Sequence, residues 1–150
     1  MKEATIRFAE KADLDDLIQL CQLHAIFEKC DYDTTDKKQK LSNHLFSVVP
    51  TLYCLVVEHL DTIVGYATYM KQFSTWDADF YIYMDCLFMT EASRGLGIGE
   101  QLVNRIKQEG HLLRCSHIQW QTPDFNERAM KFYARIGAKS KSKERYFLDI

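Results

Sequence analysis

The spacing of apolar residues predicts an α/β fold, because segments with a helical period alternate along the chain with segments of strand period. Four helices are expected over residues 13–28, 36–47, 100–109 and 126–136. Gly110 and Gly137 follow the last two helices and are placed to end them. Strand patterns occupy residues 5–8, 53–58, 63–73, 81–89, 117–121 and 146–148, and the second and third of these form a predicted hairpin. The order β-α-α-β-β-β-α-β-α-β predicts one domain over residues 1–150 with a mixed sheet.

The stretch over residues 81–99 carries the clearest chemical signal. An apolar strand leads through a short polar turn into Arg94-Gly95-Leu96-Gly97-Ile98-Gly99, which runs into a helix. Three glycines at alternate positions allow backbone N–H groups to converge on an anion at a helix N-terminus. Arg94 adds a fixed positive charge beside them. The turn therefore predicts a site for a phosphate or diphosphate group.

Several kinds of glycine-rich turn must be compared with this one. A Walker loop needs Lys-Ser/Thr after its glycines, whereas Glu100-Gln101 follows Gly99. A dinucleotide fingerprint has the spacing G-x-G-x-x-G near the start of a parallel sheet, whereas this spacing is G-x-G-x-G and lies past mid-chain. Close packing of a strand on a helix, without any ligand, is the remaining alternative for a turn of this composition.

Two patterns together resemble the GCN5-related N-acetyltransferase (GNAT) family. The first is R-x-x-G-x-G at Arg94, Gly97 and Gly99, and the second is N-x-x-A-x-x-F-Y-x-x-x-G-A over residues 126–138. They occur in the family's order, separated by one helix and one strand. The resemblance implies a twisted, mixed sheet of about six or seven strands with helices on both faces and splayed central parallel strands. It also implies an enzyme that transfers acetyl directly from acetyl-CoA, as co-substrate, to a primary amine.

The resemblance further implies which residues bind acetyl-CoA. Backbone groups on the splayed strand would contact the pantetheine arm, and the N–H of Leu87 or Phe88 would stabilise the oxyanion. The side chain of Asn126 would touch the pantetheine, although an N-cap is the structural alternative for it. Tyr133 would lie near the sulfur and protonate the leaving thiolate, with a core aromatic as the alternative. The remaining cofactor-binding residues implied are Met89, Arg94, Gly95, Leu96, Gly97, Ile98 and Gly99.

Within the family the chain resembles the diamine acetyltransferases, which include spermidine/spermine and thialysine enzymes. In that group Asp85 would correspond to the acid that serves as water-linked base and amine anchor, and Glu28 and Trp76 would line the amine groove. Two departures favour a shorter acceptor: Asp85 replaces a longer glutamate, and Cys86 replaces a second acid. The acceptor is thus expected to be a polyamine, a diamine or a lysine-like amine. A peptide or protein N-acetyltransferase and a non-catalytic acyl-CoA sensor are the alternatives.

Composition restricts the partners. The chain has 150 residues, a net charge of −2 and a pI near 6.2, which disfavours nucleic acid as a partner. No apolar run approaches the roughly 20 residues that span a bilayer, and no signal segment opens the chain, so we expect a cytoplasmic protein with no membrane partner. The five cysteines and five histidines show no metal-ligand spacing, so no metal is expected. Because family members often form dimers, a homodimer is among the assemblies that the resemblance allows.

Overall fold

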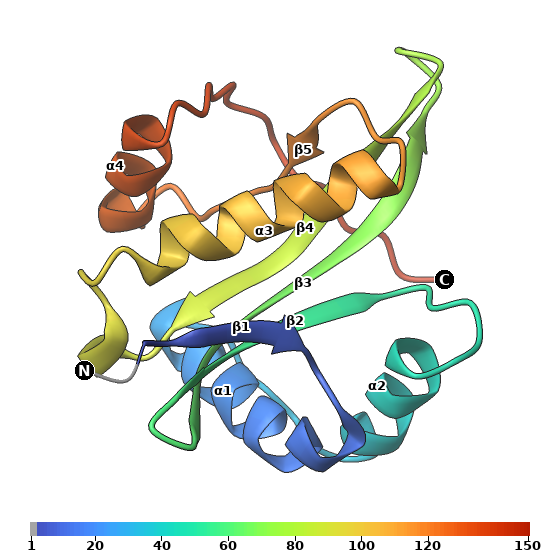
Figure 1. The fold of residues 1–150 in the computed structure, drawn as a ribbon. Coiled ribbons are helices and arrows are strands. Elements are labelled where there is room, and N and C mark those ends of the chain that lie inside the picture. Colours follow the sequence, from blue (N-terminus) through green and yellow to red (C-terminus); the bar gives the residue numbers. More distant parts are fainter. Residues whose placement is uncertain (1–2) are drawn as a thin grey trace.

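A single mixed sheet organises the protein. The computed structural model describes residues 3–150, and its five strands lie in the order β1-β2-β3-β4-β5 (Figure 1). The pairs β1–β2, β2–β3 and β3–β4 are antiparallel, and the pair β4–β5 is parallel. The strands are β1 (Thr5–Phe8), β2 (Tyr53–His59), β3 (Thr62–Ser74), β4 (Asp79–Met89) and β5 (Ile118–Gln119). The predicted hairpin is confirmed as β2 and β3.

Helices cover both faces of the sheet, as expected. The helices are α1 (Leu14–Phe27), α2 (Lys37–Leu45), α3 (Ile98–Leu112) and α4 (Glu127–Arg135), with short 3-10 helices at Lys11–Asp13 and Glu91–Ser93. Alternate side chains of β2 point to opposite faces. Leu55 and Val57 pack into the core beneath α3, whereas Cys54 and Val56 pack against α1 and α2. Among residues 3–150, no helix is both long enough and apolar enough to cross a membrane.

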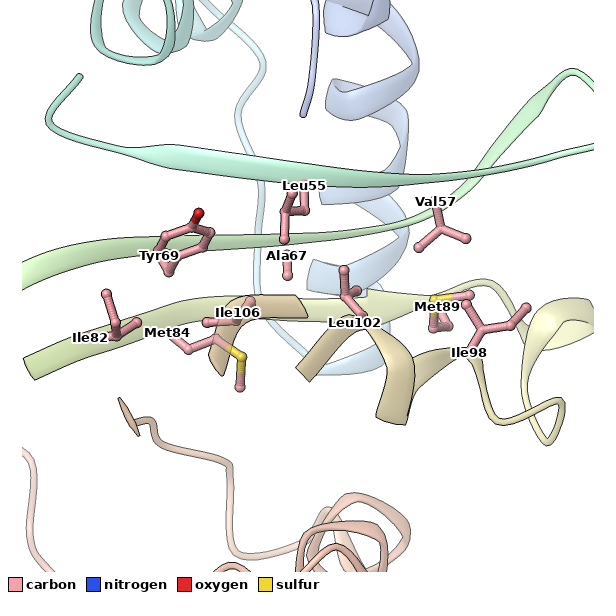
Figure 2. Close-up of a cluster of buried hydrophobic side chains, with 10 residues drawn as sticks. All are labelled: Leu55, Val57, Ala67, Tyr69, Ile82, Met84, Met89, Ile98, Leu102 and Ile106. Atoms are coloured by element: carbon pink, nitrogen blue, oxygen red, sulfur yellow. The ribbon is translucent and has the colours of Figure 1, made fainter. Parts of the chain in front are cut away.

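The core beneath α3 joins the central strands to that helix. Figure 2 shows its side chains converging from β2, β3, β4 and α3. Leu55, Ala67, Leu102 and Ile106 have no exposed surface. Complete burial of a branched side chain contributes about 1.5–3 kcal/mol relative to exposure. The core therefore holds α3, and with it the glycine-rich turn at its N-terminus, firmly against β4.

One register shift in the sheet falls on β4. Thr68 of β3 pairs with Cys86, but the next residue, Tyr69, pairs with Met84. Asp85 is therefore an extra residue on β4, which is the definition of a β-bulge. Bulges re-aim side chains and often lie beside active sites, so the sheet itself marks Asp85 as unusual.

The bulge changes which β4 residues face α3. Before it Ile82 and Met84 pack in the core beneath α3, and after it Leu87 and Met89 do. Cys86 packs instead on the opposite face, beside α1. One inserted residue thus shifts the alternation from even to odd positions, as the two-residue period of a strand requires.

The predicted last strand is wrong. Residues 146–148 form no strand, and the chain after α4 is coil to its end (Figure 1). Tyr146, Phe147 and Leu148 are 90, 79 and 93% exposed. A β-strand requires a neighbour for its N–H and C=O groups, and no strand in residues 3–150 pairs with this segment. Without this segment the sheet has five strands instead of six or seven. The strand predicted over 117–121 is also shorter than expected, at Ile118–Gln119.

The predicted end of the third helix is also wrong. α3 continues past Gly110 to Leu112, and Arg114 takes the left-handed conformation after it, with φ +58°. A Cβ atom on Gly110 would lie 3.3 Å from Cγ1 of Ile82. Gly110 therefore permits close approach of α3 to the sheet. Gly137, by contrast, follows α4 with φ +90°, which confirms its predicted role.

A buried ion pair joins β1 to the start of α1. Asp13, only 7% exposed, accepts hydrogen bonds from Nη1 and Nη2 of Arg7 at 2.7 and 3.0 Å. It also accepts one from the backbone N–H of Glu10 at 2.7 Å. The Arg7 Nε donates to Glu58 on β2 at 2.9 Å. The hydrogen bonds from Arg7 lower the pKa of Asp13, against the opposing effect of its burial.

We predict that Asp13→Asn lowers the free energy of unfolding by about 1–3 kcal/mol at pH 7, because Arg7 loses a charged acceptor in a buried site. A carboxylate with a lowered folded-state pKa stabilises fully above its unfolded value, about 3.9, and this stability is lost as the pH falls through the folded-state pKa. Denaturant titrations from pH 7 to pH 2 should therefore converge for variant and wild type. Asp16→Asn, at an exposed position in the first turn of α1, is the control. A difference that stays constant over this pH range would contradict the assignment.

Candidate active site

Strands β4 and β5 pair briefly and then separate. The parallel ladder joins Ile82 to Ile118 and Tyr83 to Gln119. Beyond it β4 continues to Met89, and the only strand paired with it there, within residues 3–150, is β3. The final part of β4 therefore has one open edge, at which an extended ligand can form backbone hydrogen bonds as an added strand would.

The alternation along β4 shows which backbone groups reach this edge. Residues on one face of a strand direct their N–H and C=O groups to the same neighbour. The N–H of Ile82 donates to the carbonyl of His117 at 2.9 Å, on the β5 side. Leu87 and Met89 share its side-chain face beyond the bulge, so their backbone groups are directed to the open edge. Phe88 lies on the other face, which favours Leu87 over Phe88 as the oxyanion donor.

The glycine-rich turn has the backbone conformation that its sequence requires. Gly95 and Gly97 have φ of +79° and +76°, which residues with a Cβ rarely adopt. Gly97 is the N-cap of α3, which begins at Ile98 rather than at residue 100. The first N–H groups of a helix lack intrahelical acceptors, so those of the first turn of α3 are available to an anion. Gly99 also packs: a Cβ there would lie 3.5 Å from Cζ of Phe132 on α4.

Arg94 is held by several contacts. Its Nε donates to the carbonyl of Met89 at 2.9 Å, and its guanidinium lies 4.6 Å from the ring centre of Phe27 and 5.4 Å from that of Phe88. These contacts tie the end of β4 to the end of α1. Burial, and then the charge of Arg128, lower the pKa of Arg94. The two arginines therefore lie close enough for their charges to interact.

Arg128 was missed by the sequence analysis. It lies in the first turn of α4, where a basic residue opposes the helix dipole. A positive charge at the start of a helix is unfavourable unless an anion binds there. This pattern is the signal by which the sequence could have identified Arg128. Together with Arg94 and the start of α3, Arg128 adds positive charge near the end of β4.

Tyr133 of α4 is partly enclosed by aromatic rings. Its ring lies edge-on to Trp120, with centroids 5.1 Å apart, and 5.4 Å from Phe132. Burial first, and then the negative charge of Glu28, raise the pKa of Tyr133 to about 12. The phenol therefore stays protonated at neutral pH and can donate a proton. Asn126 is confirmed as the N-cap of α4, since its Oδ1 accepts the N–H of Ala129 at 3.2 Å.

Two carboxylates lie near α1 and on β4. Glu28 follows the last residue of α1, and its Oε1 is 3.1 Å from Nε2 of His24. Asp85 is exposed on the β4 bulge. Burial, followed by the charge of Asp85, raises the pKa of Cys86 to about 12, so this cysteine remains a neutral thiol.

Trp76 is not among the residues that the structure brings together. It is 97% exposed in the turn between β3 and β4. That turn lies at the opposite end of β4 from Met89 (Figure 1). At about 3.3 Å of rise per residue, the start of β4 is roughly 20 Å from Asp85. Within one copy of the chain, Trp76 is therefore separate from Asp85 and Tyr133.

Two hollows of the surface lie elsewhere. One of about 440 Å³ lies beside Asp36 and Lys38, and one of about 270 Å³ lies beside Phe46 and Pro50. Neither contains the combination of carboxylates, tyrosine and anion-binding turn found at the β4 edge. In the part of the chain that the structure describes, no group of three or more His, Cys, Asp or Glu side chains could hold a metal ion.

Comparisons with known proteins agree on one family. The family model described as "Acetyltransferase (GNAT) family" matches residues 14–138. Thialysine N-epsilon-acetyltransferase of Bos taurus is 28% identical over 141 residues, which cover 89% of this chain and 82% of that protein. Spermidine/spermine N(1)-acetyltransferase-like protein 1 of Homo sapiens is 26% identical over 93% of this chain and 21% of its own.

Solved structures show the same fold. An integron cassette protein from V. cholerae has a TM-score of 0.76 and 27% identity, covering 99% of this chain and 94% of that one. An aminoglycoside N-acetyltransferase in complex with CoA has a TM-score of 0.82 and 14% identity, covering 98 and 95%. Because the family match spans most of the chain and both signature patterns lie at the β4 opening, this protein is an N-acetyltransferase that belongs to the GNAT family.

Proposed function

We propose that the protein transfers acetyl from acetyl-CoA to a primary amine of a small cationic acceptor, such as a polyamine, a diamine or a lysine-like amino acid. The observation that carries the proposal is a protonated phenol whose pKa responds to the charge of a carboxylate. Burial first, and then the charge of Glu28, raise the pKa of Tyr133 to about 12. The phenol would be the proton donor for a leaving thiolate, and the carboxylate would be an anchor for a cation.

Acetyl-CoA binding would use the groups along the open edge. The backbone of Leu87 and Met89 would hydrogen-bond the pantetheine arm, and the amide nitrogen of Asn126 would donate to it. The turn from Arg94 to Gly99 and the first turn of α3 would hold the pyrophosphate. Arg128 would add a second cation on this side. The acetyl carbonyl would then lie near the Leu87 N–H.

The reaction requires a neutral amine, although an alkyl amine with a pKa of roughly 10.4 is protonated at pH 7. Asp85 would take a proton from the bound ammonium through water. The free nitrogen would then attack the acetyl carbon, and the Leu87 N–H would stabilise the oxyanion as the C–N bond forms. Tyr133 would give its proton to the sulfur as the C–S bond breaks. The amide nitrogen would release its extra proton to water, from which Tyr133 would be reprotonated.

The acceptor assignment rests on charge and on relatives. Glu28 and Asp85 are spaced carboxylates, which favour a cationic substrate. Relatives named for thialysine, spermidine/spermine, D-amino acids and L-ornithine all act, by their names, on amines. All five cysteines are free, which suits the reducing cytoplasm that we propose as its location. A homodimer stays a prediction.

The proposal predicts thiol release from acetyl-CoA with small cationic amines. The panel should include putrescine, spermidine, spermine, lysine, thialysine, an aminoglycoside and several peptides. Turnover confined to lysine-like amines would indicate that Cys86, in place of an acid, limits the length of the acceptor. Turnover with peptides alone would overturn the small-acceptor assignment in favour of a peptide acetyltransferase. Acetyl-CoA binding without turnover of any amine would favour a sensor.

We expect Tyr133→Phe to lower kcat by about 10²-fold or more, because the thiolate loses its general acid. The dissociation constant for acetyl-CoA, measured by calorimetry, should stay within about threefold of wild type. Tyr146→Phe, in the exposed C-terminal segment, is the matched control. Because the Tyr133 pKa is about 12, the wild-type rate should show no loss up to pH 10. A variant with wild-type kcat would remove Tyr133 from the mechanism.

Asp85→Asn should lower the rate most at neutral pH and less at high pH. Near pH 7 the acceptor is protonated and needs a base, whereas near its own pKa of about 10.4 the free amine forms without one. Profiles of kcat/KM against pH for the wild type and the variant measure this difference. Asp149→Asn in the C-terminal segment is the control. Parallel profiles would show that Asp85 serves as an anchor and not as a base.

A further inference from the structure

His24 of α1 lies in a position that neither sequence motif includes. Its side chain is 13% exposed, one helical turn before Glu28. Its ring stacks on Phe88 of β4, with centroids 5.1 Å apart and an interplanar angle of 22°. It also meets the ring of Tyr66 edge-on, at 5.9 Å. The imidazole therefore lies between α1 and the sheet, next to Glu28.

Both ring nitrogens of His24 have partners. Nδ1 is 2.8 Å from the hydroxyl of Tyr66, and Nε2 is 3.1 Å from Oε1 of Glu28. Tyr66 is 1% exposed, and burial raises its pKa far above its ordinary value. Its hydroxyl therefore keeps its proton. Glu28, Tyr66 and His24 form one continuous hydrogen-bonded chain from the core to the site.

The direction of this chain follows from its chemistry. A carboxylate accepts hydrogen bonds and cannot donate them, so the nitrogen facing Glu28 must carry a hydrogen. When the imidazole is neutral, the other nitrogen is an acceptor, and the buried phenol of Tyr66 donates to it. When it is protonated, both nitrogens donate, and the bond to Glu28 has the same direction. His24 thus donates to Glu28 in either state, so it orients this carboxylate and does not accept a proton from it.

We propose that His24, itself oriented by Tyr66, is a positioning residue that fixes Glu28 as the cation anchor of the acceptor site. The inference rests on the proposed function, because it assigns Glu28 to the acceptor. With Oε1 engaged by His24, Oε2 of Glu28 is the oxygen left for an ammonium group. Without the imidazole, the Glu28 side chain would lose a charge-assisted hydrogen bond and gain rotational freedom. Preference for cationic acceptors therefore depends on a residue that does not touch them.

The hydrogen bonds that join Tyr66, His24 and Glu28 also explain why His24 and Tyr66 occur together. A histidine between α1 and the sheet leaves a buried nitrogen that must be satisfied, and Tyr66 supplies the hydroxyl. The thiols of Cys21 and Cys86, which also lie near this hydroxyl, are weaker partners because thiols are poor hydrogen-bond acceptors. The Tyr66 ring is anchored in the core shared by α1 and β3. The position of Glu28 is therefore fixed by contacts with the sheet, through His24 and Tyr66, and not only by the end of α1.

The test combines substitution with a charge-specific readout. In His24→Leu the KM for spermidine or lysine should rise about tenfold, as expected when one charge-assisted hydrogen bond is lost, while the KM for acetyl-CoA and kcat stay within about threefold. His24→Gln, whose amide can still donate to Glu28, should recover most of the loss. His111→Leu, at an exposed position near the end of α3, is the control. Calorimetric titration of the CoA-loaded protein with spermidine and with lysine gives the affinities independently of turnover.

A double-mutant cycle separates positioning from general packing. Glu28→Gln should weaken spermidine binding. In this background His24→Leu should add less than about twofold to the loss, because both changes remove the same interaction, the anchoring of the cation by Glu28. Additive losses, or an equal rise in the KM for acetyl-CoA, would overturn the inference while leaving the acetyltransferase function intact. Spermidine binding that depends on His24 without any turnover would overturn the proposed function alone. If neither amine binds, the inference fails together with the acceptor assignment.

Discussion

The structure depends on the unequal pairing of β4, which has a complete partner on one edge and a brief one on the other. Its ladder with β3 runs from Met89 opposite Gly65 to Asp79 opposite Ser74, whereas its ladder with β5 covers only Ile82 and Tyr83. An open strand edge would invite another chain. Here the side chains of the final part of β4 pack into cores on both faces of the sheet. The opening is therefore a fixed feature of the fold, available to an extended ligand.

Packing brings the ends of three helices to this opening. Phe27 at the end of α1 lies near Phe88, with ring centroids 6.5 Å apart, and the start of α3 contacts Phe132 of α4 through Gly99. Arg94 lies over Phe27 and accordingly links α1 to the turn. Apolar contacts thus place a carboxylate from α1, an anion-binding turn from α3 and a phenol from α4 around one strand. Residues that are distant in sequence come together here because the apolar residues next to them in the sequence pack against one another.

Much of this arrangement could be predicted from the sequence, because the signals were local. The glycines that adopt positive φ, the Asn126 cap and the β2–β3 hairpin each depend on a few adjacent residues. The failures were non-local. Tyr146 to Leu148 have strand-like composition, but strand formation depends on a partner that composition cannot supply. The bulge at Asp85 is visible only in the register with β3, and the His24–Tyr66 contact joins residues 42 positions apart. Trp76 stays a predicted groove residue, and its distance from Asp85 within one copy of the chain is likewise set by the β3–β4 pairing and not by adjacent residues.

The net charge of −2 conceals a site that contains charges of both signs. Arg94, Arg128 and the start of α3 supply positive charge, which suits the phosphates of a nucleotide. Glu28 and Asp85 supply negative charge, which suits an amine. Tyr133 is a neutral proton donor, kept neutral by its burial and by the charge of Glu28. These groups come from separate elements, with the carboxylates at the end of α1 and on β4 and the cations in the glycine-rich turn and on α4. The folded chain therefore offers complementary charge to an anionic and to a cationic substrate, which makes direct transfer between the two physically reasonable.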